Sequence, residues 1–202
     1  MREKSETGAW TVRPCGERDL DAMRDICIET SSLPLRDDRD RQFLLLLYCD
    51  PYVQYAAENC FVAVDAGDRP VGYILCAADT RAFFRIFRKR VLPQIRRLGA
   101  RYAIQARGVC AQQRLCAVFA PAHLHIDLTA SVRRKGVGTA LMHTLKAHLA
   151  SQGVARVELT CGSGNHAAIR FYQQNGFRIL LKGFGACVMR AKTADDTTNL
   201  HP

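Results

Sequence analysis

A strand, a glycine-rich turn and a long amphipathic helix follow one another between residues 122 and 149. The letters "AHLHIDLTA" alternate between apolar and polar residues, which is the pattern of a half-buried strand. Apolar residues of the following helix recur at helical spacing, at Val137, Leu141, Leu145 and Leu149, with Ala140 and His148 beside them. Such a stripe must be buried against another layer, and "ARVELTC" supplies a further strand directly after it. This succession predicts an α/β domain.

The remaining pattern predicts the other elements of the same domain. Strands are expected at 10–15, in a hairpin at 60–78 and as a closing pair at 177–190, and helices at 16–30, 41–59, 80–98 and 165–175. Asp50-Pro51 interrupts the second helical region, because the residue before proline is displaced from the α conformation. Residues 99–122 have no clear period, so we expect an irregular insertion with a short helix at 111–118. The order indicates one α/β domain with a mixed sheet over 1–190, followed by a disordered tail over 191–202.

The composition limits the class of protein. With 202 residues, 48% of them apolar and 24% charged, the chain has ordinary globular proportions and the length of one domain. Its longest apolar run, "FLLLLYC", is far shorter than the roughly 20 residues of a membrane-spanning helix. The first ten residues have no apolar core of the kind that a secretory signal needs. We therefore expect a soluble, cytoplasmic protein that does not bind a membrane.

Nine cysteines are spread irregularly through the chain, and no two of them form a C-x-x-C pair. An odd number without a secretory signal argues against a disulfide framework, so reduced and mostly buried thiols are expected. Zinc sites use closely spaced Cys and His pairs, which do not recur here. The letters "HLH" place His123 and His125 on one face of a strand, but a single pair of this kind more often has a structural role. No metal site is predicted.

Positive charge is concentrated in a basic insertion around 81–122. The formal net charge is +10, and residues 81–126 contain no Asp or Glu. The basic residues of this segment are Arg81, Arg85, Arg88, Lys89, Arg90, Arg96, Arg97, Arg101, Arg107 and Arg114. One interpretation is a surface for nucleic acid, an acidic protein or an anionic ligand. The other, which we favour, is a solvated helix face with a poorly structured insertion, since few aromatic residues interleave with the charges to stack on bases.

The turn that precedes the helix at 137–149 has the features of an anion site. Gly136 and Gly138 allow the backbone to approach a ligand closely, and the N–H groups of the first helical turn point outward at the positive end of the helix dipole. Three basic residues stand directly before the first glycine. The turn is not a P-loop, because no lysine follows either glycine. It is not a dinucleotide-binding fingerprint, because Leu141 occupies the place of the third glycine. A pyrophosphate is the expected occupant.

Two short motifs resemble those of a known enzyme family. The first is [QR]-x-x-G-x-[GA], present as Arg133-Arg134-Lys135-Gly136-Val137-Gly138. The second is N-x-x-A-x-x-F-Y-x-x-x-G-F, present as "NHAAIRFYQQNGF". With the preceding strand and the closing pair of strands, they resemble the GNAT N-acetyltransferases over about 61–189, the basic insertion excluded. The chain departs from the family at Ala130, where a proline is common.

A narrower resemblance is carried by "YCDPYVQYAAENCFVAVD", "RPVGYIL", the basic insertion and "PAHLHIDL". These segments are similar to bacterial acetyltransferases that resemble the C-terminal acetyltransferase-like domain of O-GlcNAcase.

The resemblance to the GNAT family implies a fold and a cosubstrate. The fold is α/β, with a mixed, mostly antiparallel central sheet flanked by helices on both faces, and the cosubstrate is acetyl-CoA without a metal. The strand that ends at Leu128 is expected to splay from the strand at 157–160, leaving a gap for the pantetheine arm. A backbone N–H near Leu128 would bind the thioester carbonyl. The implied coenzyme A-binding residues are Leu128, Arg133, Arg134, Lys135, Gly136, Val137, Gly138, Thr139 and Asn165. For Asn165 a plain helix N-cap is the alternative role.

The resemblance also implies catalytic roles. Tyr172 matches the family's position for the acid that protonates the coenzyme A sulfur, and the pKa values of a phenol and a thiol permit this transfer. The alternative is that Tyr172 is a core aromatic residue. Asp127, beside the expected oxyanion donor, is a candidate base or a structural hydrogen-bond acceptor. Residues that either line the acceptor pocket or end a helix and pack are Asp50, Tyr52 and Tyr55.

Three functions remain open on the sequence. The leading one is an acetyl-CoA-dependent N-acetyltransferase that acts by direct attack of an amine, either of a small molecule or of a protein lysine or N-terminus. The second is a non-catalytic acyl-CoA-binding module, and the third is a nucleic-acid-binding protein that uses residues 81–126, which we expect less. The expected assembly is a monomer or a homodimer.

Overall fold

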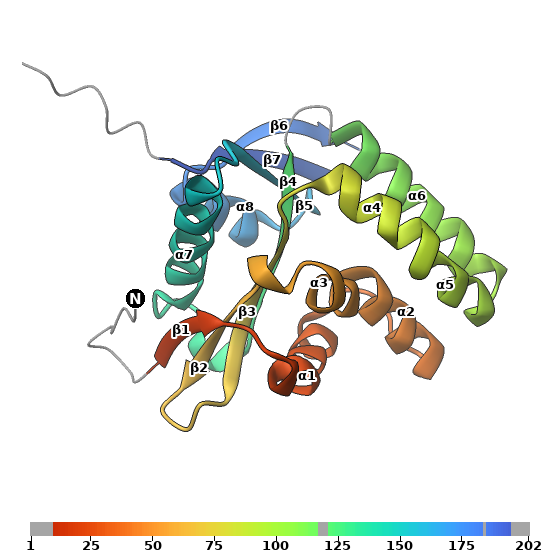
Figure 1. The fold of residues 1–202 in the computed structure, drawn as a ribbon, viewed down its shortest axis with the longest axis horizontal. Coiled ribbons are helices and arrows are strands. Elements are labelled where there is room, and N and C mark those ends of the chain that lie inside the picture. The colour runs from red at the N-terminus through yellow and green to blue at the C-terminus, as the bar shows by residue number, and fades with distance from the viewer. Residues whose placement is uncertain (1–9, 117–120, 184, 195–202) are drawn as a thin grey trace, which may run out of the picture.

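The computed structural model describes residues 10–116, 121–183 and 185–194, without the side chains of residues 112–116. Figure 1 shows the chain coloured along its length. In chain order the described elements are β1 (Trp10–Pro14), α1 (Leu20–Thr30), α2 (Asp38–Tyr48), α3 (Asp50–Tyr55), β2 (Phe61–Asp65), β3 (Pro70–Ala77), α4 (Thr80–Arg90), α5 (Leu92–Leu98), α6 (Ala100–Cys116), β4 (Ala122–Leu128), α7 (Val137–Ser151), β5 (Arg156–Gly162), α8 (His166–Gln174), β6 (Arg178–Gly183) and β7 (Ala186–Lys192).

The strands form one sheet in the order β1-β2-β3-β4-β5-β7-β6. Every neighbouring pair is antiparallel except β4 and β5, which are parallel. The pairing of β4 with β5 is limited to Ala122 with Val157 and His123 with Glu158, so the two strands part beyond His123. The predicted mixed, mostly antiparallel sheet is confirmed.

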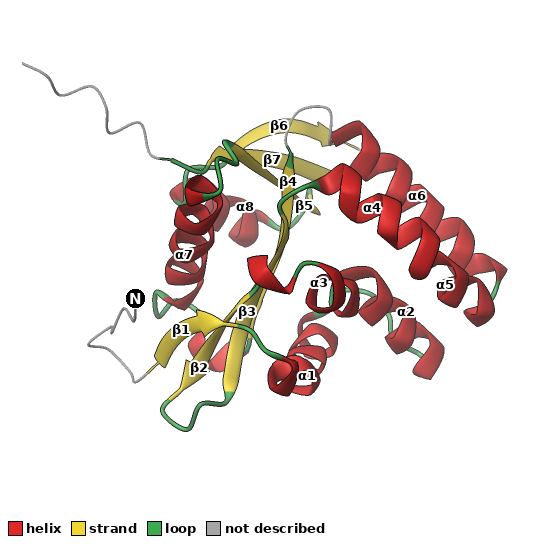
Figure 2. Cartoon of the chain, viewed as in Figure 1, coloured by secondary structure: helices red, strands yellow, loops and turns green. Residues whose placement is uncertain are grey.

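Helices cover both faces of the sheet, which is seen nearly edge-on in Figure 2. On one face lie α7 and α8, and on the other lie α1 to α6. The apolar stripe predicted for α7 is confirmed, because Val137, Leu141, Leu145 and Leu149 are fully buried. They pack with residues of the strands and with Ile169 of α8 in one apolar core. The α1–α6 side has a separate core, which contains the phenylalanines of α2 and α4.

Alternation along β4 sends neighbouring side chains to these two cores. Ala122 and Leu124 pack on the α7 side. His123, His125 and Asp127 face the α1 side, since they pair with β3 residues whose side chains lie in the α1–α6 core. The strand therefore presents an apolar face to the α7–α8 layer and a polar face to α1–α3.

Two interruptions of helices follow from proline. The helical region at 41–59 is broken at Cys49, and Pro51 lies in the first turn of α3. The amphipathic segment at 80–98 divides into α4 and α5, with Pro93 in the first turn of α5, where the missing N–H costs no hydrogen bond. The expected apolar face of this segment is buried: Phe83, Phe84, Phe87, Val91 and Leu92.

The expectation of an irregular insertion at 99–122 is wrong. Residues Ala100–Cys116 form α6, which packs against α4 and α5. Its buried side chains are Tyr102, Ala106 and Cys110, spaced by four residues on one helix face. Two of the three are small, and Ile104 is 69% exposed on the opposite side. The apolar period is therefore too weak to be visible in the sequence, although the helix has a buried stripe. Of the short helix expected at 111–118, residues 117 and 118 lie outside the described residues.

The C-terminal boundary also differs from the prediction. Strand β7 continues to Lys192, so residues 191 and 192 belong to the sheet rather than to a tail. Thr193 is buried as well, and its hydroxyl donates to the Val154 carbonyl at 2.5 Å. Residues 195–202 lie outside the described residues. No described helix combines the length and the apolar composition that crossing a bilayer requires.

Candidate active site

The parting of β4 from β5 leaves backbone groups of β4 without a strand partner. Thr129 N–H donates to the Val71 carbonyl at 3.0 Å, on the β3 side. Hydrogen bonding alternates along an antiparallel pair, so the N–H groups of Ile126 and Leu128 point away from β3, into the gap. A donor at Leu128 facing a gap is the arrangement that the sequence predicted for binding a thioester carbonyl.

The glycine-rich turn enters α7 beside this gap. Gly136 is the N-cap residue with φ +81°, and Arg134 also has a positive φ, +61°. The first helical N–H that finds an intrachain acceptor here is that of Ala140, which donates to the Gly136 carbonyl at 3.0 Å. The N–H groups of the first turn before it are therefore available to an anion.

Gly138 is required by packing rather than by its backbone angles. A Cβ at this position would lie 3.0 Å from Phe171 Cζ and 3.1 Å from Leu128 Cδ1. The start of α7 thus packs closely against both the end of β4 and α8, and a side chain at this position would force Phe171 and Leu128 to shift. The glycine lets the turn lie close to the gap.

The three basic residues of the turn lie at the surface. Arg133, Arg134 and Lys135 are exposed, and the Arg133 Nε donates to the Leu128 carbonyl at 3.3 Å. This bond occupies the carbonyl of Leu128 and leaves its N–H facing the gap. Thr139 is exposed in the first turn and Val137 is fully buried beneath it.

Helix α8 supplies Asn165 and Tyr172. The Asn165 side-chain oxygen accepts the Ala168 N–H at 3.1 Å, so the N-cap role is observed and the amide nitrogen is left for a ligand. Burial raises the pKa of the Tyr172 hydroxyl, with smaller contributions from Cys161 on β5 and Asp127 on β4. The hydroxyl therefore stays protonated at neutral pH. It hydrogen-bonds to nothing in the described part of the chain.

Asp127 lies on the polar face of β4. Burial raises the pKa of its carboxyl, and this rise is opposed by the Tyr73 hydroxyl, which donates to Asp127 Oδ2 at 2.7 Å, and by Thr30 and Arg133. The charge of Asp127 contributes to the raised pKa of Tyr172, which packs against the core on the opposite face of the sheet. Tyr73 was not anticipated, since cross-strand partners are not visible in a single sequence.

The three residues expected at the acceptor pocket are placed differently from one another. Asp50 forms two bonds to Arg24 of α1, Nε to Oδ1 at 2.9 Å and Nη2 to Oδ2 at 3.1 Å. Tyr52 is 1% exposed, inside the α1–α6 core. Tyr55 is 36% exposed. The three side chains thus differ in exposure and in bonding partners.

Tyr52 instead joins the two histidines of β4. Its hydroxyl lies 2.8 Å from His123 Nε2 and 3.0 Å from His125 Nε2, and Thr80 Oγ1 lies 2.8 Å from His123 Nδ1. Burial lowers the pKa of His123 to about 3, with a further contribution from His125, and burial lowers the pKa of His125 to about 4. Both rings are neutral at neutral pH. Since a phenol has one proton, Tyr52 donates to one ring and accepts from the other.

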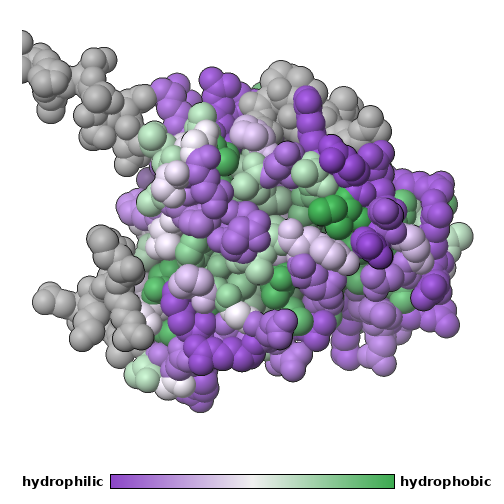
Figure 3. Space-filling model, in the orientation of Figure 1, coloured by the Kyte–Doolittle hydropathy of each residue, from purple (hydrophilic) through white to green (hydrophobic). Residues whose placement is uncertain are grey.

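The basic residues of α4 to α6 form a separate surface. Figure 3 shows hydrophilic side chains over the region where Figure 1 places these helices. The aromatic residues of these helices whose side chains are described, Phe83, Phe84, Phe87 and Tyr102, are buried, so the described part of this surface offers no stacking platform. Arg114 lies where side chains are not described.

The fold and this gap can be compared with known proteins. The model of the acetyltransferase (GNAT) family matches residues 20–177. The chain belongs to the GNAT family of acetyltransferases. The family resemblance inferred from the two motifs is confirmed.

Solved structures of GNAT proteins superpose on most of the chain. The crystal structure of SsHAT has a TM-score of 0.80 and 29% identity, covering 93% of this chain and 100% of that one. Two others are similar in fold: Ard1 from Thermoplasma volcanium (TM-score 0.58, 20% identity, covering 93% and 99%) and paiA N-acetyltransferase from Thermoplasma acidophilum in complex with coenzyme A (0.58, 13%, 91% and 99%).

Proposed function

We propose that the protein is an acetyl-CoA-dependent N-acetyltransferase in which an amine attacks the acetyl thioester directly, in a ternary complex. The observation that carries this proposal is the parting of β4 from β5 directly beside the glycine-rich start of α7. One ligand with a pyrophosphate at the turn and an extended arm in the gap fits both features. A coenzyme A complex of paiA N-acetyltransferase, which has the same fold, supports this choice.

The residues present fit coenzyme A. The tight contact of Gly138 with Phe171 and Leu128 forms a cradle that a Cβ would fill. Free N–H groups of the first turn of α7 would hold the pyrophosphate, assisted by the charges of Arg133, Arg134 and Lys135. The free amide nitrogen of Asn165 would donate to the pantetheine arm. Bound acetyl-CoA supplies an activated acetyl group.

The gap would then hold the reacting atoms between two donors. The Leu128 N–H points into it and would stabilise negative charge that develops on the carbonyl oxygen. The Tyr172 hydroxyl, protonated and without a protein acceptor, would give its proton to the sulfur as the carbon–sulfur bond breaks. Tyr172 would regain a proton from solvent after the products leave.

Asp127 would take the proton that the amine loses as its nitrogen bonds to the acetyl carbon. Its raised pKa brings the carboxylate closer to the basicity that proton transfer near neutral pH requires. The side chain faces α1, whereas the turn for coenzyme A begins α7 on the other face. Two substrates can therefore approach the gap from opposite layers and be present together.

We also propose that the chain belongs to the bacterial group that resembles the acetyltransferase-like domain of O-GlcNAcase. Two of the segments that carry this resemblance, "YCDPYVQYAAENCFVAVD" and "PAHLHIDL", are joined by hydrogen bonds of Tyr52 to His123 and His125. Members of that group should contain these three residues together, and their absence from the group would reject the placement.

Acetyl-CoA binding and thiol release test the function together. Calorimetry should show binding, and the melting temperature should rise with acetyl-CoA, because a ligand of the native state stabilises it. Release of free thiol should depend on an added amine from a panel of small amines, amino sugars, aminoglycosides and lysine peptides. Absence of acetyl-CoA binding would reject the proposal. Binding without thiol release for any amine would instead favour the non-catalytic acyl-CoA module.

A further inference from the structure

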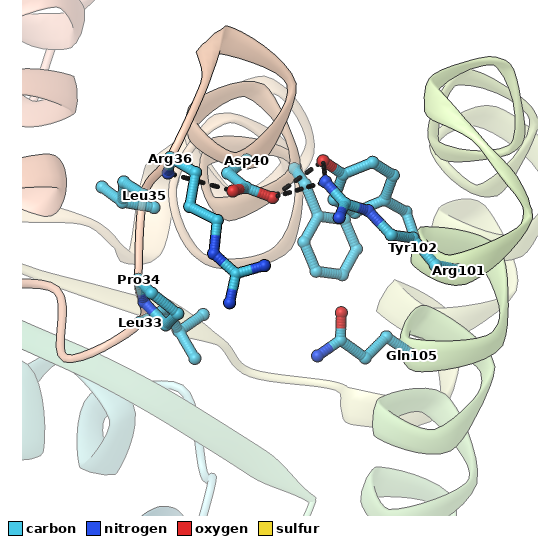
Figure 4. A pocket seen from close by; sticks show the side chains of 9 residues that line it. Leu33, Pro34, Leu35, Arg36, Asp40, Arg101, Tyr102 and Gln105 are labelled. Carbon is cyan, nitrogen blue, oxygen red and sulfur yellow. Dashed lines mark hydrogen bonds and ion pairs between the residues drawn. The ribbon is translucent and has the colours of Figure 1, made fainter.

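A hollow of about 340 Å³ lies between the loop after α1 and helix α6. Figure 4 shows the side chains around it. One wall is made by Leu33, Pro34, Leu35 and Arg36, and the other by residues of α6 and the start of α2. The lining combines apolar surface with charged and amide groups. A mixed lining of this kind suits a peptide, whose side chains present both aliphatic and polar atoms.

Asp40 fixes the two walls relative to one another. Its carboxylate accepts from the Tyr102 hydroxyl at 2.7 Å, from Arg101 Nη2 at 3.1 Å and from the Arg36 N–H at 3.0 Å. These donors hold the pKa of Asp40 below its ordinary value, so it stays ionised. Its single charge acts on both Arg101 and Arg36, and its oxygens are occupied by protein donors.

The hydrogen bonds of Asp40 do not involve the guanidinium of Arg36, which carries a further positive charge. The guanidinium forms no hydrogen bond or ion pair within residues 10–116, 121–183 and 185–194, and it projects into the hollow in Figure 4. The Gln105 carboxamide projects from the opposite wall. The lining contains two guanidiniums and one carboxylate, so a net positive charge remains. A guanidinium, with its five N–H donors, opposite a carboxamide is suited to bind a carboxylate.

The hollow is within reach of the gap between β4 and β5. Thr30, the last residue of α1, lies beside Asp127 and influences its pKa. Leu33 at the edge of the hollow follows only three residues later, a span of at most about 10 Å of extended chain. Arg36 follows Thr30 by six residues, at most about 20 Å of extended chain, so an acceptor whose amine lies at Asp127 could reach Arg36 with a group several residues away.

We infer that the acceptor is an acidic peptide, whose amine reacts beside Asp127 while a carboxylate up to about six residues away binds between Arg36 and Gln105. This inference rests on the proposed function and names its substrate class. Exposed basic residues lie along α4 and α5, which favours an acceptor with more than one negative charge over a small amine with a single one.

Matched peptides test the inference. Two peptides have a free N-terminus and one lysine. They differ only in having either Glu or Gln at every position from the second to the sixth residue after the lysine. Their binding to the protein with bound coenzyme A is measured by calorimetry, and kcat/KM is measured with acetyl-CoA. We expect the Glu peptide to bind at least tenfold more tightly and to react with at least tenfold higher kcat/KM.

Two variants separate the hollow from general electrostatics. Arg36→Gln should remove the preference for the Glu peptide, whereas Arg97→Gln, which removes the same charge from an exposed position of α5, should retain it. Equal binding of both peptides, or an equal effect of the two variants, would overturn the inference. So would saturable binding of a duplex oligonucleotide, weakened by Arg36→Gln, with no binding of the acidic peptide. If the protein binds the Glu peptide more tightly but transfers no acetyl group, the proposed function is rejected. The hollow would still be assigned as a binding site for acidic peptides.

Discussion

Tyr172 combines a buried ring with a hydroxyl that has no protein partner in the described structure. Its ring packs with Phe171 and Phe177, at centroid distances of 5.3 and 5.9 Å. Tyr172→Phe therefore preserves the packing and removes only the proton donor. We expect kcat to fall by about 10²–10³, the range of a lost general acid, with little change in the binding of acetyl-CoA.

Steady-state kinetics and calorimetry on the same preparation check this prediction. The melting temperature serves as the control, because it should change little. A Tyr172→Phe variant as active as the parent would assign Tyr172 to the core alone. That is the alternative role that the sequence left open.

The two neutral histidines make stability depend on pH. Their pKa values in the folded protein, about 3 for His123 and about 4 for His125, lie below the ordinary value of about 6.5. The neutral form is thus favoured on folding, so the stabilisation is complete above pH 6.5 and is lost as the pH falls towards 4. For His125 alone, the loss between pH 7 and pH 5 is up to about 2 kcal/mol.

Urea unfolding at pH 7 and at pH 5 measures this loss. His125→Gln, which keeps a hydrogen-bonding side chain without a group that titrates, should lose less stability over the same interval. An equal loss in parent and variant would place the pH dependence elsewhere in the molecule.

The residue scale is where sequence reasoning had the least information. The motif at 165–177 identified Tyr172, and strand alternation placed His123 and His125 on one face. The partner of those histidines, Tyr52, precedes His123 by 71 residues, and Tyr73 precedes Asp127 by 54. Contacts of that separation depend on the register of the sheet and the packing of α3, which a single sequence does not contain.

The start of α7 gives the clearest prediction for an element. Gly138→Val would drive the new side chain into Phe171 and Leu128, where even a Cβ would lie 3.0 and 3.1 Å from their carbons. We expect a loss of about 1–3 kcal/mol of stability from this overpacking. The affinity for acetyl-CoA should fall at least tenfold, because the turn moves away from the gap.

Gly108→Val is the matched control for that substitution. Gly108 lies in α6, and a Cβ there would meet nothing within 4 Å. The same change should leave the affinity for acetyl-CoA unaltered and cost no stability, since valine is a better helix former than glycine. If Gly138→Val binds acetyl-CoA with unchanged affinity, the close packing at Gly138 does not position the turn for coenzyme A.

At the scale of helices and strands, the sequence predicted every described strand, because apolar residues between turn residues are a strong signal. It missed α6, whose buried stripe of Tyr102, Ala106 and Cys110 is barely apolar. It also placed the end of β7 too early. Residues 191 and 192 look like part of a polar tail, but pairing with Val157 and Arg156 of β5 extends the strand.

For the whole molecule, the weak pairing of β4 with β5 divides the sheet into two parts. The antiparallel strands β1 to β4 form one part, and β5, β7 and β6 form the other, joined by two residue pairs. The two apolar cores do not follow this division, because the α7–α8 core contains residues of both parts. The halves are thus held chiefly by that core, and a ligand in the gap would bridge them.

Amide hydrogen exchange detects such a bridge at single residues. The N–H groups of Ile126 and Leu128 point into the gap, so they should exchange quickly in the free protein and at least tenfold more slowly with acetyl-CoA bound. The neighbouring Thr129 N–H, which donates to the Val71 carbonyl, is the internal control and should be protected in both states. If Leu128 remains unprotected when acetyl-CoA binds, the arm does not lie along β4. A ligand held only by the turn at α7 would protect that turn and leave the two parts of the sheet unbridged.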